Sequence, residues 1–182
     1  MEGSLCSLEF QFEFSDPSRF SDNASMTTST TTRLINAFPD ADYQAFVDPD
    51  LLVQWQAPEG MTATLHHFDP RPGGGYEMSL FYDNPSIAGK SGANEDRYTA
   101  TFIELVQPRH IVESIAFSIS DGTAAGEPMI MTVDLESRGV STLVTMTFEH
   151  LPPDVSPADN DLGTQQSLAK LARLIESDPS LP

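Results

Sequence analysis

Six segments in the centre of the chain alternate apolar and polar residues, and this pattern constrains the fold more than any other feature. The segments span residues 61–68, 75–82, 97–106, 111–119, 129–136 and 140–150. Short runs rich in Gly, Pro, Asp and Asn separate them, and Ser137-Arg138-Gly139 is one example. Alternation places successive side chains on opposite faces of a strand, and short connections join antiparallel neighbours. The pattern therefore predicts an antiparallel meander.

One face of this sheet is expected to be covered and the other to face water, because the two sets of side chains differ in polarity. The polar set is Glu77, Ser79, Thr132, Asp134, Thr145 and Thr147. The apolar set includes Leu80, Tyr82, Val133, Leu135, Val140, Val144, Tyr76, Met78, Tyr98, Phe102, Phe117, Met129, Met131, Met146 and Phe148. Its many aromatic residues and methionines suit an adaptable hydrophobic cavity, and packing of the core alone also explains them.

Helices are predicted on both sides of the six strands. A first strand at 28–38 leads into a helix that begins at Pro39, and Asp48-Pro49-Asp50 begins a second helix that contains Trp55. Asp and Pro are favoured at these first positions. Ser156-Pro157-Ala158-Asp159 resembles a capping box, and four apolar residues follow at helical spacing, namely Leu168, Leu171, Leu174 and Ile175. One long helix over one curved antiparallel sheet is an α+β architecture, and the gap between these two layers is expected to determine the function.

The first 25 residues differ from the rest, and we treat them as an N-terminal extension of a domain that spans residues 26–182. Four apolar residues alternate with polar ones as in a strand, namely Leu8, Phe10, Phe12 and Phe14, and a turn-rich stretch follows to Ser25. We favour a leader or an upstream start choice before Met26. The alternative is an extra edge strand that pairs with a neighbour, which would favour a homodimer.

Composition excludes several classes of function. Lys and Arg number 9 against 27 Asp and Glu, a net charge of −18, so binding of nucleic acid or of anionic lipid headgroups is not expected. The longest apolar stretches are too short to span a membrane. A single cysteine, Cys6, supports neither a disulfide framework nor a thiolate metal site, and the N-terminus lacks the pattern of a secretory signal. We therefore expect a cytoplasmic protein without a cofactor.

Four motifs carry a resemblance to a known family. They are residues 48–55 (DPDLLVQW), 68–74 (FDPRPGG), 104–111 (ELVQPRHI) and the helix at 163–175. Together they resemble the SRPBCC superfamily and, more narrowly, bacterial homologues of the C-terminal domain of the activator of the heat-shock chaperone ATPase, over residues 27–177. The resemblance implies a START-like helix-grip fold with a hydrophobic cavity. Members often carry tryptophan after the glycine that begins the last helix, whereas Thr164 follows Gly163 here. A chaperone-binding or pocket role that this tryptophan has in the family is therefore not transferred to Thr164.

Arg71 and the histidines are weaker candidates for a site. Arg71 lies between two prolines and before a run of glycines, which indicates either an anion site or a tight turn in which the guanidinium pairs with a carboxylate, and we favour the turn. His66 and His67 are adjacent on a predicted strand, so they point to opposite faces and share no metal unless a bulge intervenes. His150 is expected at the mouth of the cavity as a rim residue. The sequence contains no ligand spacing typical of zinc sites.

Glu113 shares a face with Ile111, Ile115 and Phe117 if the alternation is strict. Its carboxyl group then lies in an apolar cavity with a raised pKa, where it could anchor a ligand or move a proton, or else a bulge turns it outward. Glu104 is ambiguous in the same way. We favour the solvent-facing position for both.

Three functional hypotheses follow. The first is a non-enzymatic module that binds a small hydrophobic molecule between the last helix and the sheet. The second is a co-chaperone whose acidic surface contacts a chaperone. The third, which carries least weight, is a polyketide cyclase-like enzyme that uses Glu113, His150 or Tyr98 to move a proton. No catalytic or metal-binding residue is assigned, and the predicted ligand-binding residues are Trp55, Tyr76, Met78, Tyr98, Phe102, Glu113, Phe117, Met129, Met131, Met146, Phe148, His150, Leu168 and Leu171.

Overall fold

The computed structural model describes residues 27–89, 91–118, 126–153 and 155–177. Both interpretations of the segment 1–25 concern residues outside these ranges. The described chain forms, in order, β1 (Ser29–Ile35), α1 (Pro39–Val47), α2 (Pro49–Trp55), β2 (Met61–Asp69), β3 (Gly75–Tyr82), β4 (Glu95–Val106), β5 (His110–Phe117), β6 (Met129–Arg138), β7 (Ser141–Glu149) and α3 (Pro157–Ser177).

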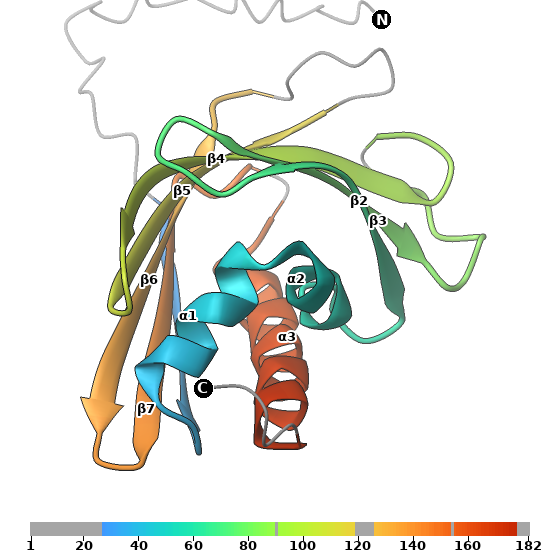
Figure 1. Cartoon of the computed structure of the whole chain (residues 1–182). Helices are drawn as coiled ribbons and strands as arrows, with labels where there is room; N and C mark the ends of the chain where they lie inside the picture. Colours follow the sequence, from blue (N-terminus) through green and yellow to red (C-terminus); the bar gives the residue numbers. More distant parts are fainter. Residues whose placement is uncertain (1–26, 90, 119–125, 154, 178–182) are drawn as a thin grey trace, which may run out of the picture.

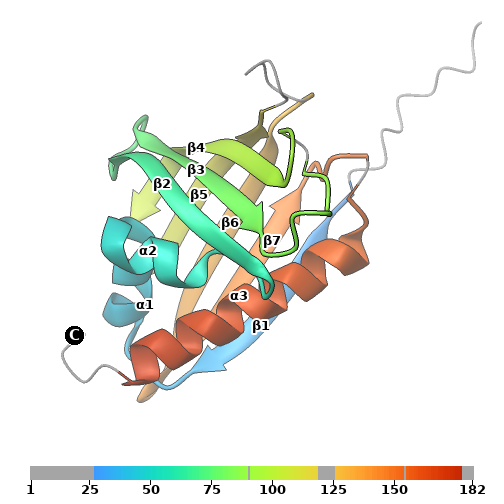
Figure 2. The same cartoon turned by 90° about the vertical axis from the view of Figure 1, so that its right-hand side faces the viewer.

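The strands form one antiparallel sheet with the order β1-β7-β6-β5-β4-β3-β2. From β2 to β7 each strand pairs with the next along the chain, and β1 adds to the far edge beside β7. The sheet curls around α3, and α1 and α2 lie at one end of the space between them (Figures 1 and 2). This architecture confirms the α+β helix-grip fold expected from the sequence.

The bounds of the strands differ from the predicted ones mainly at their ends. β1 ends at Ile35, because the chain turns before Phe38, which is the N-cap of α1. At the start of β7, Val140 lies in the turn from β6 and is 75% exposed. After β7, His150 is exposed and has a left-handed φ of 59°. The apolar face therefore includes neither Val140 nor His150, and this part of the prediction was wrong.

The concave face of the sheet holds the core, and the convex face is mainly polar as predicted. Val133 and Val144 are fully buried on the concave side, whereas Asp134 is exposed on the convex side. Ser79 also belongs to the convex side but is fully buried. Its hydroxyl group is satisfied there, because it bonds with His66 Nε2 at 2.8 Å and donates to Glu95 Oε1 at 2.5 Å.

Gly75 begins β3 at a point where only glycine fits. A Cβ atom built on it would lie 2.0 Å from the carbonyl oxygen of Ala100 in β4. Gly75, the last glycine of the run, therefore permits the close approach of β3 and β4.

α2 begins at the predicted cap. Asp48 Oδ1 accepts hydrogen bonds from the backbone N–H groups of Asp50 at 2.9 Å and Leu51 at 3.1 Å. Both N–H groups would otherwise lack a partner within the helix. We expect Asp48→Ala to lower the free energy of unfolding by about 1 kcal/mol, measured by urea denaturation with Trp55 fluorescence. Asp48→Asn keeps the acceptor and should lose less than half as much, so equal losses in the two variants would contradict the capping role.

α3 also begins as predicted, because Ser156 and Asp159 form a reciprocal cap. Ser156 Oγ accepts from the backbone N–H of Asp159 at 3.1 Å and donates to its carboxylate at 2.7 Å. The inner side of the helix packs on the sheet through Leu168, Leu171 and Ile175, all of which are buried. None of the described helices is long and apolar enough to cross a membrane.

Hydrogen bonds hold the two flanks of α3. Toward β1, the hydroxyl of Thr31 bonds with Asp161, and Asn160 Nδ2 donates to the hydroxyl of Ser29. On the other flank, Lys170 Nζ donates to the carbonyl oxygens of the segment after α2, Ala57 at 2.7 Å and Pro58 at 3.2 Å. These bonds fix the helix at a set distance from the concave face of the sheet.

Candidate functional site

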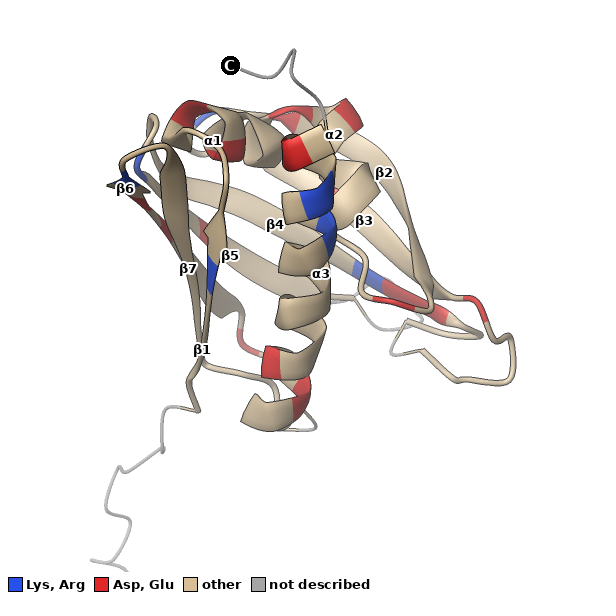
Figure 3. Ribbon diagram, turned by 90° about the horizontal axis from the view of Figure 1, so that it is seen from below, with Lys and Arg blue, Asp and Glu red and all other residues tan. Residues whose placement is uncertain are grey.

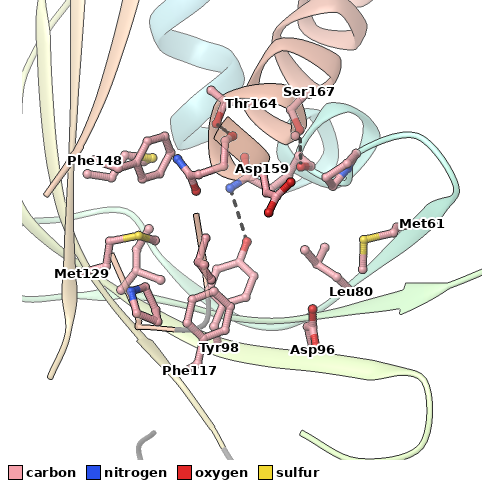
Figure 4. Close-up of a pocket in the computed structure, with 18 of the residues that line it drawn as sticks. Met61, Leu80, Asp96, Tyr98, Phe117, Met129, Phe148, Asp159, Thr164 and Ser167 are labelled. Carbon is pink, nitrogen blue, oxygen red and sulfur yellow. Dashed lines mark hydrogen bonds between the residues drawn. The ribbon is translucent and has the colours of Figure 1, made fainter. Parts of the chain in front are cut away.

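A cavity of about 350 Å³ lies between the N-terminal half of α3 and the concave face of the sheet (Figure 4). This volume falls within the range typical of small-molecule sites. The sheet contributes Met61, Leu80, Tyr82, Asp96, Tyr98, Ile115, Phe117, Met129, Met131, Met146 and Phe148 to its lining. The helices and the connections beside them contribute Trp55, Gln56, Pro58, Pro152, Val155, Asp159, Asn160, Gly163, Thr164 and Ser167.

The wall formed by α3 consists of small or polar side chains. Asn160, Gly163, Thr164 and Ser167 are spaced three, four and seven residues apart, so they share one face of the helix. Farther along the helix Leu168 and Leu171 are fully buried in the core, and larger side chains there fill the space. The cavity is therefore open where α3 carries small residues. Thr164 has a small side chain, and its size contributes to the free volume.

Trp55 closes the cavity at the end of α2. Its side chain is fully buried, and its ring meets that of Phe46 edge-on with the ring centroids 4.7 Å apart. The indole Nε1 donates to the carbonyl oxygen of Ala45 at 2.9 Å. Trp55 thus joins α2 to α1 and presents a rigid apolar surface to the cavity.

Two tyrosines bring hydroxyl groups to the cavity, and these hydroxyls have different acceptors. Tyr82 donates to the carboxylate of Asp96 at 3.0 Å, and burial raises the pKa of Tyr82 to about 12. Tyr98 donates to the thioether sulfur of Met78 at 3.2 Å and accepts a hydrogen bond from Gln56 Nε2 at 3.3 Å. Burial also raises the pKa of Tyr98, so its hydroxyl group stays protonated.

Half of the predicted ligand-binding residues reach the cavity. Those that line it are Trp55, Tyr98, Phe117, Met129, Met131, Met146 and Phe148. Six others lie in the buried core outside the lining, namely Tyr76, Met78, Phe102, Glu113, Leu168 and Leu171. His150 is exposed and is not among the lining residues. The alternation of each strand selects the buried face but does not separate the lining residues from the core residues on that face.

Sequence reasoning missed the α3 wall. Gly163, Thr164 and Ser167 carry no chemical motif, but their small side chains interrupt the large apolar residues expected along a buried helix face. This interruption is the signal in the sequence from which an open space beside the helix could have been inferred.

Glu113 is fully buried, so the solvent-facing interpretation was wrong for this residue. Its Oε2 accepts a hydrogen bond from the hydroxyl of Tyr76 at 2.9 Å, and its Oε1 has no hydrogen-bond partner within the described residues. Burial raises the pKa of Glu113 to about 7, because water no longer stabilises the carboxylate, and the bond from Tyr76 opposes the rise only in part. Glu113 is therefore a buried core acid that lies next to the lining residue Met131 in the pairing of β5 with β6.

Two bulges decide the orientation of the other titratable candidates. Between Phe102 and Glu104 the register with β5 shifts, and Glu104 is exposed as expected. A second shift between Leu65 and His67 leaves both His66 and His67 exposed, so the prediction of opposite faces was wrong. Within the described ranges, no three His, Cys, Asp or Glu side chains are arranged to hold a metal ion.

The loop at Arg71 is a turn, as we favoured from the sequence. Arg71 Nε lies 3.0 Å from the carboxylate of Asp69. The N–H groups of Gly73 and Gly74 donate to backbone carbonyls of Phe102 and Arg71, at 2.8 Å each. These glycine N–H groups are therefore already occupied and do not form an anion site.

The charges around the cavity are mainly negative. The lining contains Asp96 and Asp159, and no Lys or Arg is present among the described lining residues. The basic residues of α3 lie beside α2 (Figure 3), where Lys170 binds backbone carbonyls and Arg173 lies 3.7 Å from Glu59. An uncharged apolar molecule therefore suits the cavity better than an anionic one.

A curled antiparallel sheet wrapped around a long C-terminal helix, with a hydrophobic cavity between them, defines a helix-grip protein. The model of the family described as activator of Hsp90 ATPase homolog 1-like protein matches residues 36–176, and this chain belongs to that family. The resemblance noted in the sequence is thereby confirmed.

Solved structures show the same fold. A protein from Chromobacterium violaceum is 28% identical with a TM-score of 0.74, and the match covers 84% of this chain and 99% of that one. The AHSA1 protein from Silicibacter pomeroyi is 16% identical with a TM-score of 0.69, covering 83% and 99%. The AHSA1-like protein from Aeromonas hydrophila is 22% identical with a TM-score of 0.59, covering 81% and 92%. Among curated proteins, none matches this sequence.

Proposed function

We propose that this protein binds a small hydrophobic molecule in the cavity between α3 and the concave face of the sheet, without catalysing a reaction. The observation that carries the proposal is the 350 Å³ cavity, whose sheet side is lined mainly by aromatic residues and methionines. Methionines adapt to varied ligand shapes, and small residues on α3 keep the space open. The carboxylates in the lining favour a ligand without negative charge.

An enzymatic function has less support. Of the three proton carriers considered from the sequence, Glu113 lies outside the cavity lining and His150 is exposed on the surface. Tyr98 remains, but its raised pKa makes it a weak acid. A cyclase-like reaction would require an acid or base that touches the ligand, and of these three residues only Tyr98 lines the cavity, where its raised pKa disfavours loss of its proton.

Filling the cavity should abolish ligand binding. We expect Thr164→Trp to place an indole ring in the space beside Gly163, because Thr164 lines the cavity and is 8% exposed. The measurement is native mass spectrometry of freshly purified protein, compared with the same sample after denaturation. The wild type should carry an apolar adduct that is released on unfolding, and the variant should carry none.

Gln165→Trp is the matched control. Gln165 is the next residue on α3 and is exposed, so this variant adds the same side chain outside the cavity. It should retain the adduct. Fluorescent hydrophobic probes extend the test to protein that has lost its ligand during purification. Equal probe binding by both tryptophan variants would contradict the proposal.

The native mass spectra of the wild type also give the oligomeric mass. They therefore test the homodimer considered from the sequence.

Contact with a chaperone is the second candidate function, supported by the description of the family and by the net charge of −18. Both functions suit a protein of the cytoplasm, which is our proposal for its location. The Thr164→Trp variant separates them, because it changes the cavity and leaves the surface charge as it is. Capture of a purified chaperone by both wild type and variant, without any bound ligand in the wild type, would favour the second function.

A further inference from the structure

We propose that the hydroxyl group of Tyr98 anchors the ligand by donating a hydrogen bond to a carbonyl-type oxygen, so that the ligand is an apolar molecule with a ketone, aldehyde or ester group. This inference rests on the proposed function and names the ligand class of the same cavity. The two tyrosines of the lining, Tyr82 and Tyr98, differ in the hydrogen-bond acceptors of their hydroxyl groups.

Tyr98 has a poor acceptor in the absence of ligand. Its O–H group points to the sulfur of Met78 at 3.2 Å, and a thioether sulfur is a weak acceptor. A carbonyl oxygen is a much better acceptor, and a buried donor gains most from a good partner. The other lining tyrosine, Tyr82, already donates to the carboxylate of Asp96. Replacing this charge-assisted hydrogen bond by one to a neutral carbonyl oxygen would cost free energy.

The surroundings hold the Tyr98 hydroxyl ready as a donor. Gln56 Nε2 donates to its oxygen at 3.3 Å, which polarises the group and leaves the O–H hydrogen with only the weak acceptor Met78. The ring is held by Tyr76 and Phe117, with centroid distances of 6.1 and 5.8 Å. Burial and the fixed ring reduce the entropy lost when a ligand binds.

Tyr98 lines the cavity, whereas its acceptor Met78 lies in the core outside the lining, so the O–H group would turn about its C–O bond to reach a ligand. The side chain rises from β4 toward α3, between Phe117 and Leu80 (Figure 4). A ligand whose apolar part lies against Met131, Met146 and Phe148 would place one polar atom near this hydroxyl group. The remaining lining offers mostly apolar contacts, which do not require a second polar group.

A matched pair of probes tests the inference. 2-Acetylnaphthalene and 2-isopropylnaphthalene are similar in size, and only the first has a carbonyl oxygen. We expect Tyr98→Phe to weaken binding of 2-acetylnaphthalene about tenfold and to leave 2-isopropylnaphthalene within about twofold. Tyr82→Phe is the control and should leave the ratio of the two affinities unchanged, because its hydroxyl serves Asp96.

Infrared spectroscopy gives a second readout that does not depend on affinity. The carbonyl stretch of 13C-labelled 2-acetylnaphthalene should lie at lower frequency in the wild type than in a hydrocarbon solvent, and Tyr98→Phe should remove this shift. Met78→Leu conserves volume and removes the competing sulfur, so it should tighten ketone binding about threefold even if Tyr98→Phe does not fold.

The outcomes separate this inference from the proposed function. Equal effects of Tyr98→Phe on the two probes, with an unshifted carbonyl stretch in the wild type, would overturn the role of Tyr98 and leave the hydrophobic cavity in place. Failure of both probes to bind the wild type would overturn the proposed function and the anchor together.

Discussion

Asp42→Asn is expected to stabilise the protein by about 4 kcal/mol at pH 8 and to have little effect at pH 4. Asp42 lies in α1, is fully buried, and has no hydrogen-bond partner for either carboxylate oxygen within the described residues. Burial raises its pKa from 3.8 to about 7. The nearby hydroxyl of Thr142, which donates to the carbonyl oxygen of Ala37, opposes the rise in part, and the charge of Glu176 adds to it. The folded protein therefore binds a proton that the unfolded chain releases near pH 4.

The free energy of unfolding of the wild type depends on pH because the folded and unfolded states differ in proton binding. Below the pKa of the unfolded chain both states hold the proton, and the stability of the neutral acid is fully present. As the pH rises toward 7 only the folded state holds the proton, so the free energy of unfolding falls. Asparagine has the same shape and stays neutral, and therefore removes this fall.

Urea denaturation at pH 4, 6 and 8, followed by Trp55 fluorescence, measures the effect. Glu113→Gln should behave in the same way with a gain of about 3 kcal/mol at pH 8, because burial raises the pKa of Glu113 from 4.5 to about 7. Glu104→Gln is the control, since Glu104 is exposed on the neighbouring strand β4. If the pH dependence of the Asp42 and Glu113 variants matches that of the wild type, these carboxyls are not buried as neutral acids.

Trp55→Ala is expected to lower the free energy of unfolding by about 3 to 5 kcal/mol, a large share of the total stability of a domain of this size. The substitution removes a fully buried ring at the junction of α1, α2 and the cavity. It also leaves the carbonyl oxygen of Ala45 without the indole donor at 2.9 Å. Two costs therefore add, the cavity in the core and the lost hydrogen bond.

Trp55→Phe separates these two costs. It keeps most of the ring volume and removes the donor, so its loss should be smaller than that of the alanine variant, about 1 to 3 kcal/mol. Circular dichroism follows unfolding in these variants, because they lack the single tryptophan. Gln54→Ala, exposed on the same helix, should cost less than about 0.5 kcal/mol. A Trp55→Ala variant as stable as Gln54→Ala would show that the ring is not part of the core.

Local patterns in the sequence predicted most elements, because each pattern acts over a few neighbouring residues. The Asp48 and Ser156 caps formed as expected, since a cap is a bond between residues two or three positions apart. Most strands kept their alternation, and the register shifts at two bulges interrupt it. His66, His67 and Glu104 lie at such irregular points, and an extra residue in one strand cannot be read from alternation within that strand.

The position of Glu113 depended on the whole assembly. Alternation correctly placed it on the apolar face, and the expectation that a carboxylate avoids burial was the step that failed. Tyr76 reaches it from β3, two strands away in the sheet, and supplies the hydrogen bond that a neutral acid can use. Such a partner belongs to a distant segment and is not visible from either segment alone.

The sequence by itself determined the antiparallel sheet, the long helix over it, the covered face of the sheet and the caps of the helices, because alternation, helical spacing and turn residues are local properties. Only the tertiary structure decided which apolar residues surround free space and which fill the core. A cavity remains where the space between α3 and the sheet is larger than the volume of the side chains that lie in it. The space that is left depends on residues from distant segments, such as Gly163 and Thr164 on α3 and Met131 and Phe148 on the sheet, which come together only after folding.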